Sequence, residues 1–269
     1  MEKTKKFLTL LLVIIMLLTT SPLNGFADIN WLGFKASASV SETIFSYNGY
    51  VCRVVNGKTD TASIINTSFI SSTISSEWVI PNIVVNVIDS ETSIAYPVTD
   101  ISGGFSYDAV KAKKIIVPNT VKRINSGAFL GCSYLEEIKL SESLEEIGPS
   151  AFSNCKNLKR LVIPDSVISI DNHAFSGCSN MESIHFGKNI KSIGDYAFSG
   201  CIQIRNFTFP STVTELGFQA YDFYLNIDEA NSVYSSINGV LFNKDKTELI
   251  FFPSSLGPDQ SYRIPDGVI

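Results

Sequence analysis

Apolar residues recur along most of this chain with a period of 23 residues. Four consecutive blocks share one pattern of apolar and polar positions, and they cover residues 115–137, 138–160, 161–183 and 184–206. Self-similarity at a fixed period of about 20–50 residues is typical of a repeat array, in which neighbouring units bury a continuous core. The pattern therefore predicts a solenoid of stacked coils. The apolar columns are Leu135, Leu158, Met181 and Ile204; Ile138, Leu161, Ile184 and Phe207; Leu140, Ile163, Phe186 and Phe209; Leu144, Val167, Ile190 and Val213; and Ile147, Ile170, Ile193 and Leu216.

Each coil is expected to contribute one short strand to a parallel sheet on the concave side. In the second block Ile138 and Leu140 face the interior, while Lys139 between them faces solvent, because strand side chains alternate. Proline recurs just after this strand, at Pro118, Pro164 and Pro210. A residue without an N–H group cannot continue the ladder, so the strand ends there. The following Ala151-Phe152 pair and its equivalents leave room only for a short 3₁₀ or single helical turn on the convex side. The predicted fold is a mainly β solenoid.

The repeat decays at both ends of the chain. Residues 28–97 contain no repeat, but the segments 47–55 and 61–70 predict a hairpin and a further strand is expected around 78–88. We expect an N-terminal β cap here, because an open solenoid end would expose core and strand edges. A small independent β domain is the alternative.

Residues 98–269 hold the repeats, which are interrupted near their end. An insert at about 231–260 contains a predicted β-hairpin over 238–253 that turns at 243–247. Residues 263–269 then restart the repeated phrase, so the last repeat of the sequence is incomplete.

The first 27 residues predict a secretory signal peptide. Residues 1–6 are basic, residues 7–18 are apolar, and Gly25 and Ala27 are small residues before an expected cleavage site. An uncleaved N-terminal anchor is the alternative. Cleavage removes a net charge of +2 and takes the formal charge from −5 to −7. We expect a secreted or cell-surface protein without membrane insertion after cleavage, and an acidic chain without Lys/Arg clusters argues against nucleic acid as a partner.

Four of the five cysteines occupy one position of successive coils: Cys132, Cys155, Cys178 and Cys201. Neighbouring coils lie about 4.8 Å apart, but parallel Cβ vectors are poor disulfide geometry. We therefore expect a column of buried thiols that pack as small hydrophobes. A straight column cannot surround one zinc ion tetrahedrally, so no metal is expected. Cys52 lies apart in the N-terminal segment.

The repeated phrase resembles the BspA-like, treponemal-type leucine-rich repeats. Residues 161–183 match the family pattern L-x-x-L-x-L-P-x-S/T-L/V-x-x-I-G-x-x-A-F-x-x-C-x-x almost throughout, and the resemblance extends over about 98–269. It implies an exported protein, commonly one of the cell surface that mediates adhesion, with no catalytic residues to carry over. The alternative is a targeting or spacer segment for a catalytic or wall-binding domain beyond the last residue.

Candidate catalytic chemistry is sparse in the sequence. The two histidines, His173 and His185, are both expected at the surface, and neither belongs to a recognisable nucleophile or metal motif. We therefore expect a non-enzymatic protein without cofactors.

The candidate ligand face consists of the outward strand residues, which form two columns along the coils. Such a face would bind an extracellular protein or glycan of host or microbial origin. Its members are Lys114, Glu137, Arg160, Ser183 and Asn206 in one column, and Lys139, Val162, His185 and Thr208 in the other.

Overall fold

The computed structural model describes residues 42–47, 50–55, 62–66, 77–87, 93–103, 105, 111–204, 207–217, 219, 225–253 and 262–268. Within these residues the secondary structure is entirely β, with strands and turns but no helix. The predicted signal peptide lies outside the described residues.

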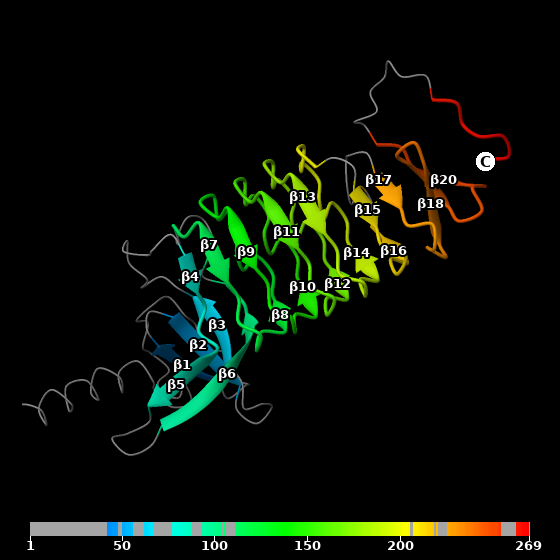
Figure 1. Ribbon diagram of the computed structural model, residues 1–269. Helices are drawn as coiled ribbons and strands as arrows, with labels where there is room; N and C mark the ends of the chain where they lie inside the picture. Colours follow the sequence, from blue (N-terminus) through cyan, green and yellow to red (C-terminus); the bar gives the residue numbers. More distant parts are fainter. Residues whose placement is uncertain are drawn as a thin grey trace, which may run out of the picture.

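Successive coils stack side by side along one axis, as the sequence predicts (Figure 1). One strand of each coil joins a parallel sheet that we call the long-strand sheet. Its members are β4 (Glu77–Val79), β7 (Lys114–Ile116), β9 (Glu137–Lys139), β11 (Arg160–Val162) and β13 (Ser183–His185). The register follows the repeat, with Lys114 opposite Glu137 and Arg160 opposite Ser183. The prediction of a mainly β solenoid is confirmed.

A second parallel sheet runs along the opposite side of the coils. We call it the short-strand sheet, since each coil contributes only two residues to it. Its strands from the repeats are β8 (Arg123–Ile124), β10 (Glu146–Ile147), β12 (Ser169–Ile170), β14 (Ser192–Ile193) and β16 (Glu215–Leu216). The sequence predicts a single sheet, so this prediction is incomplete. Hydrogen bonding between stacked coils is as regular here as on the first side.

A third row of backbone hydrogen bonds links the Ala-Phe turns of neighbouring coils. The amide of Phe152 donates to the carbonyl of Ala174 over 2.7 Å, and Phe175 donates to Ala197 over 2.8 Å. The residue before each Ala-Phe pair lies in the left-handed region, with φ of 57° at His173. The stretch is a series of turns closed by i→i−3 hydrogen bonds, such as that from the Ser176 amide to the His173 carbonyl over 3.0 Å, so the expected short turn on the convex side is present without forming a helix. Backbone polar groups are thus satisfied between coils on three sides.

The core is a stack of aromatic rings bordered by thiols. The rings of Phe152 and Phe175 stack 5.1 Å apart with an interplanar angle of 2°, and both side chains are fully buried. The thiol of Cys178 donates to the carbonyl of Phe152 over 3.2 Å, and Cys201 donates to Phe175 over 3.3 Å. Hydrogen bonding to Cys201, followed by burial, raises the pKa of the Cys178 thiol well above its ordinary value. The expected column of buried thiols is present, and each thiol also has a hydrogen-bond acceptor in the preceding coil.

The N-terminal strands continue both sheets. They are β1 (Glu42–Tyr47), β2 (Tyr50–Val55), β3 (Ala62–Asn66), β5 (Ile83–Val87) and β6 (Ser93–Ile101). Strand β4 pairs with β7, and β6 pairs with β8, so the first edge of each sheet is covered. An ion pair of 2.6 Å between Arg123 and the buried carboxylate of Asp100 reinforces the second junction. The sequence indicates the β2–β3 hairpin but neither β1 nor the division of 78–88 into β4 and β5.

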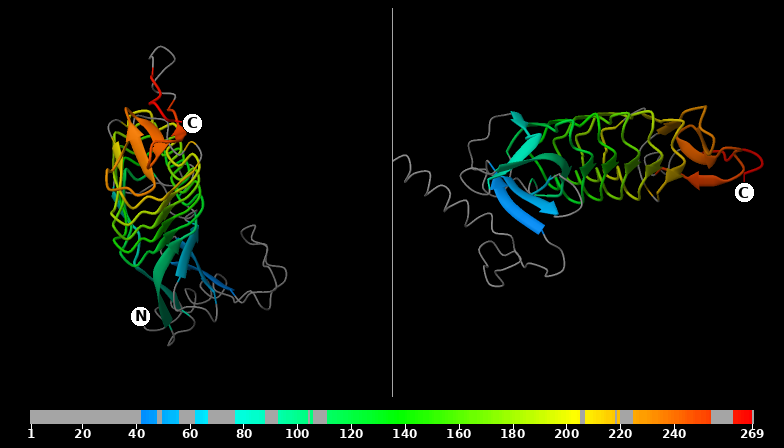
Figure 2. Two further views of the ribbon diagram at one scale, coloured as in Figure 1. Left: turned by 90° about the vertical axis from the view of Figure 1, so that its right-hand side faces the viewer. Right: turned by 90° about the horizontal axis from the view of Figure 1, so that it is seen from below.

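The C-terminal strands depart from the repeat. Strands β15 (Phe207–Phe209) and β17 (Leu225–Ile227) pair in parallel, and they are followed by β18 (Tyr234–Ile237), β19 (Val240–Asn243) and β20 (Leu249–Phe251). The last three form an antiparallel sheet, which adds β18 to the predicted hairpin. This sheet lies at the end of the solenoid opposite the N-terminal strands (Figure 2).

Candidate binding surfaces

The outer face of the long-strand sheet carries the predicted ligand columns. Their inward neighbours are buried, with Ile138 5% and Leu161 2% exposed, because the alternation of the strands directs every second side chain to the core. Val162 is 63% exposed. The described members of the two columns are exposed at Glu137, Lys139, Arg160, Val162, Ser183, His185 and Thr208, and half-buried at Lys114. Asn206 lies outside the described residues.

Part of the charge on this face is paired between coils. The ammonium of Lys114 lies 3.4 Å from the carboxylate of Glu137. At the preceding residue, the carboxylate of Glu136 lies 2.8 Å from the ammonium of Lys113 and 3.7 Å from the ammonium of Lys159. The hydrogen bond from Lys113, together with its charge, lowers the pKa of Glu136 below its ordinary value. These side chains link neighbouring coils, and this reduces the number of charges directed at a ligand.

Beyond these pairs the face is mixed in character. Lys139, Val162 and His185 occupy one column in successive coils, and Arg160 lies in the other column, on the same strand as Val162. Two cationic groups and an exposed aliphatic side chain form a surface that can combine hydrogen bonds to acidic or amide groups with apolar contact. The structure brings these predicted residues together on β9, β11 and β13.

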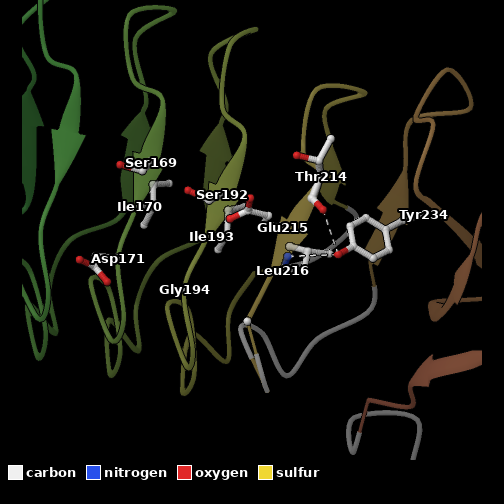
Figure 3. Close-up of a pocket in the computed structure, with 11 residues that line it drawn as sticks. Ser169, Ile170, Asp171, Ser192, Ile193, Gly194, Thr214, Glu215, Leu216 and Tyr234 are labelled. Carbon is white, nitrogen blue, oxygen red and sulfur yellow. Dashed lines mark hydrogen bonds between the residues drawn. The ribbon is translucent and has the colours of Figure 1, made fainter.

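A hollow of about 540 Å³ lies on the short-strand sheet, away from every site that the sequence predicts (Figure 3). Its lining side chains come from β12, β14 and β16, from the turns next to them and from β18. The polar members are Ser169, Asp171, Ser192, Thr214, Glu215 and Tyr234. Gly194 and Gly217 place no side chain in this part of the surface, and a Cβ atom at either position would meet the backbone of the preceding coil. Small residues repeated at the 23-residue period would have indicated the hollow from the sequence.

Tyr234 closes one end of the hollow and caps the outer edge of β16. In earlier coils the carbonyl equivalent to that of Thr214 accepts a hydrogen bond from an amide of the next coil. The amide of Lys191, for example, donates to the carbonyl of Ile168 over 2.8 Å. At the last rung the Tyr234 hydroxyl donates to the Thr214 carbonyl and accepts the Leu216 amide, each over 3.3 Å (Figure 3). Among the described strands β16 is the last of this sheet, and one phenol takes the place of the next strand. Because both bonds fix its hydroxyl, the ring is held in one orientation beside the hollow.

The structure adds no catalytic or metal-binding chemistry around the remaining candidate residues that it describes. His173 is exposed, as expected, and its ring stacks on Tyr196 with centroids 5.0 Å apart. Among the described residues, no group of three His, Cys, Asp or Glu side chains could hold a metal ion. No helix within the described ranges is long and apolar enough to cross a membrane.

Comparison with known families identifies the repeat. The profile of the BspA type leucine rich repeat region matches residues 99–228 in six copies. Residues 99–228 are a BspA-type leucine-rich repeat region. The match covers the coils from β6 to β17 and so includes both candidate surfaces except for Tyr234. A comparison with curated proteins finds no significant match.

Solved structures share the fold of this BspA-type region. The crystal structure of the pneumococcal vaccine antigen PcpA is similar with a TM-score of 0.70 and 24% identity, over 84% of this chain and 59% of that one. A leucine rich cell surface protein from Faecalibacterium prausnitzii A2-165 is similar with a TM-score of 0.55 and 23% identity, over 84% of this chain and 65% of that one. The chain thus spans less than two thirds of the length of either protein.

Proposed function

We propose that this chain is a non-enzymatic recognition protein that acts outside the cell and binds an extracellular protein or glycan through the outer face of the long-strand sheet. The observation that carries the proposal is the pair of exposed columns on β9, β11 and β13. A stack of coils supports these side chains from a buried core, so their positions are fixed before a ligand arrives.

The family and the similar structures support this proposal from a second direction. One similar structure is that of a cell surface protein, and another is that of a vaccine antigen. The predicted signal peptide agrees with export of this chain. The outward residues Lys139, Arg160 and Val162 offer modest contacts spread over neighbouring coils, which suits a protein or glycan that lies across the sheet.

A binding screen followed by charge reversal tests the proposal. The purified chain is first assayed against matrix proteins, mucins and glycans. The double substitution Lys139→Glu and Arg160→Glu is then compared with Lys156→Glu and Lys191→Glu, which make the same charge change at exposed positions elsewhere. We expect the first pair to weaken binding of the selected ligand by about tenfold or more, since charge-assisted hydrogen bonds contribute about 1.5–3 kcal/mol.

The control pair should leave binding within about twofold, and all variants should keep the parent melting temperature because exposed substitutions have small effects on stability. Equal weakening by both pairs would show that binding depends only on net charge. Normal binding by the first pair would place recognition away from the long-strand sheet.

A further inference from the structure

The hollow on the short-strand sheet has the composition of a carbohydrate site. Its polar side chains are hydroxyls and carboxylates: Ser169, Ser192, Thr214, Asp171 and Glu215. Among the described residues that line it, none is Lys, Arg or His. Such a lining accepts hydrogen bonds from hydroxyl and ammonium donors and repels phosphate, sulfate and uronate groups.

Tyr234 adds an aromatic ring at the end of this polar row. The rigid position of its ring, held through the hydroxyl by Thr214 and Leu216, means that little side-chain freedom is lost when a ligand packs against it. An aromatic face is apolar and carries negative charge density, and it attracts the C–H groups of a sugar ring and the ammonium group of an amino sugar.

The spacing of the rungs also favours a repeating ligand. Ser169, Ser192 and Glu215 occupy the same position on β12, β14 and β16, and neighbouring strands lie about 4.8 Å apart. One hydrogen-bonding group is therefore offered at regular steps, and each step is close to the length of one pyranose ring. A linear oligosaccharide places one hydroxyl-bearing ring at each such step.

A peptide fits this place less well. An extended peptide binds a sheet by pairing with the free backbone groups of an edge strand. At β16 the Tyr234 hydroxyl already occupies the amide of Leu216 and the carbonyl of Thr214. The hollow also lies over the face of the short-strand sheet, where the backbone groups of Ile170 and Ile193 belong to the ladder.

We propose that the hollow is a second binding site, separate from the long-strand face, for a linear oligosaccharide of neutral or amino sugars. The sugar chain lies across β12, β14 and β16, with one ring against Tyr234. Glu215 and Asp171 accept hydrogen bonds from its hydroxyl or ammonium groups.

Three soluble tetrasaccharides test this assignment by isothermal titration against the purified chain. The probes are cellotetraose, the glucosamine tetramer of chitosan and tetragalacturonate. We expect both of the first two to bind, the glucosamine tetramer more tightly, and the uronate not to bind. Failure of both cellotetraose and the glucosamine tetramer to bind at millimolar concentration would overturn the proposal.

Matched variants locate the binding. Glu215→Gln should weaken binding of the glucosamine tetramer about tenfold, because a charge-assisted hydrogen bond is lost. Glu146→Gln changes the same column outside the hollow and should leave affinity within about twofold. Equal affinity of both variants and the parent chain would place the sugar elsewhere and overturn the assignment.

Two further measurements separate the ring from the fold and the sugar from a peptide. Tyr234→Phe keeps the ring but loses the two hydrogen bonds that hold it, so it should bind more weakly than the parent chain, whereas Tyr234→Ala should abolish binding. Retention of full affinity by a folded Tyr234→Ala variant would contradict the role of the ring. Tetralysine should bind more weakly than the glucosamine tetramer. Tighter binding of tetralysine, lost in Glu215→Gln, would identify a basic peptide site in place of a sugar site.

Discussion

The two sheets of this solenoid share one core but present different outer surfaces. On the long-strand sheet the outward positions carry large and varied side chains, as at Lys139, Val162 and His185. On the short-strand sheet the outward positions of β12 and β14 carry only Ser169 and Ser192, and Gly194 follows directly after β14. The first surface projects side chains over several coils, while the second forms a hollow. The comparison shows that outward side chains of the strands can differ between the two sheets, because the inner columns and the backbone hydrogen bonds between coils are common to both.

The largest expected effect is at the core that both sheets share. Phe175 is fully buried and stacks against Phe152 and Phe198. Phe175→Ala should lower the free energy of unfolding by about 3–5 kcal/mol through lost burial and a residual cavity. Denaturant unfolding measures the change. Val162→Ala, at an outward position of the long-strand sheet, should cost less than about 0.5 kcal/mol, and equal losses at the two positions would contradict the assignment of inner and outer columns.

Larger side chains should be poorly tolerated at Gly194, next to the short-strand sheet, although it lies at the surface of the coils. A Cβ atom at Gly194 would lie 2.6 Å from the backbone nitrogen of Asn172, so the two coils would have to separate. Gly194→Ala should therefore cost about 1–3 kcal/mol, as expected for overpacking. Ser192→Ala, on the adjacent strand β14, serves as the control and should be close to neutral. Thermal unfolding of both variants decides the matter: a neutral Gly194→Ala would show that the coils are not in close contact here.

The thiol column should be less sensitive than the aromatic stack. Cys178→Ser places a hydroxyl within reach of the Phe152 carbonyl, which already accepts the thiol over 3.2 Å. A hydroxyl with an acceptor recovers part of its cost of burial, so we expect a loss of about 1 kcal/mol. The measurement is again the free energy of unfolding. A loss as large as that of Phe175→Ala would mean that the serine hydroxyl finds no acceptor.

The smallest effect is expected at the turn between the two sheets. His173 has a φ of 57°, a conformation that glycine adopts without strain. His173→Gly should change stability by no more than about 1 kcal/mol, whereas His173→Val should be more destabilising because a β-branched residue is strained in this region. Melting temperatures of the two variants should differ in that order. The reverse order would exclude the left-handed conformation at this turn.

The fold could be predicted from the sequence wherever a physical requirement repeats in every coil. Burial of Ile138, Phe175 and Cys178 follows from the period of 23 residues, because each must contact its equivalent in the next coil. The short-strand sheet could not be predicted in the same way. Its strands, such as Glu146–Ile147, contain two residues each, too few to show an alternating pattern.

The two candidate surfaces also differ in how far the sequence predicts them. The outward direction of Lys139 and Arg160 follows from strand alternation alone. The hollow depends on Tyr234, which lies outside the repeat and reaches β16 only through the fold of the C-terminal strands. Its hydroxyl replaces backbone groups of a missing rung, and no local pattern around residue 234 indicates this contact.

The most direct test of the account is lysine labelling with and without a ligand selected by the screen. Lys139 lies on the long-strand face, and Lys191 lies on the side of the short-strand sheet, both exposed. After acetylation of the folded protein, mass spectrometry measures the modified fraction at each lysine. If the long-strand sheet binds the ligand, saturating ligand should protect Lys139 and leave the labelling of Lys191 unchanged. Protection of Lys191 with unchanged labelling of Lys139 would contradict recognition by the long-strand sheet.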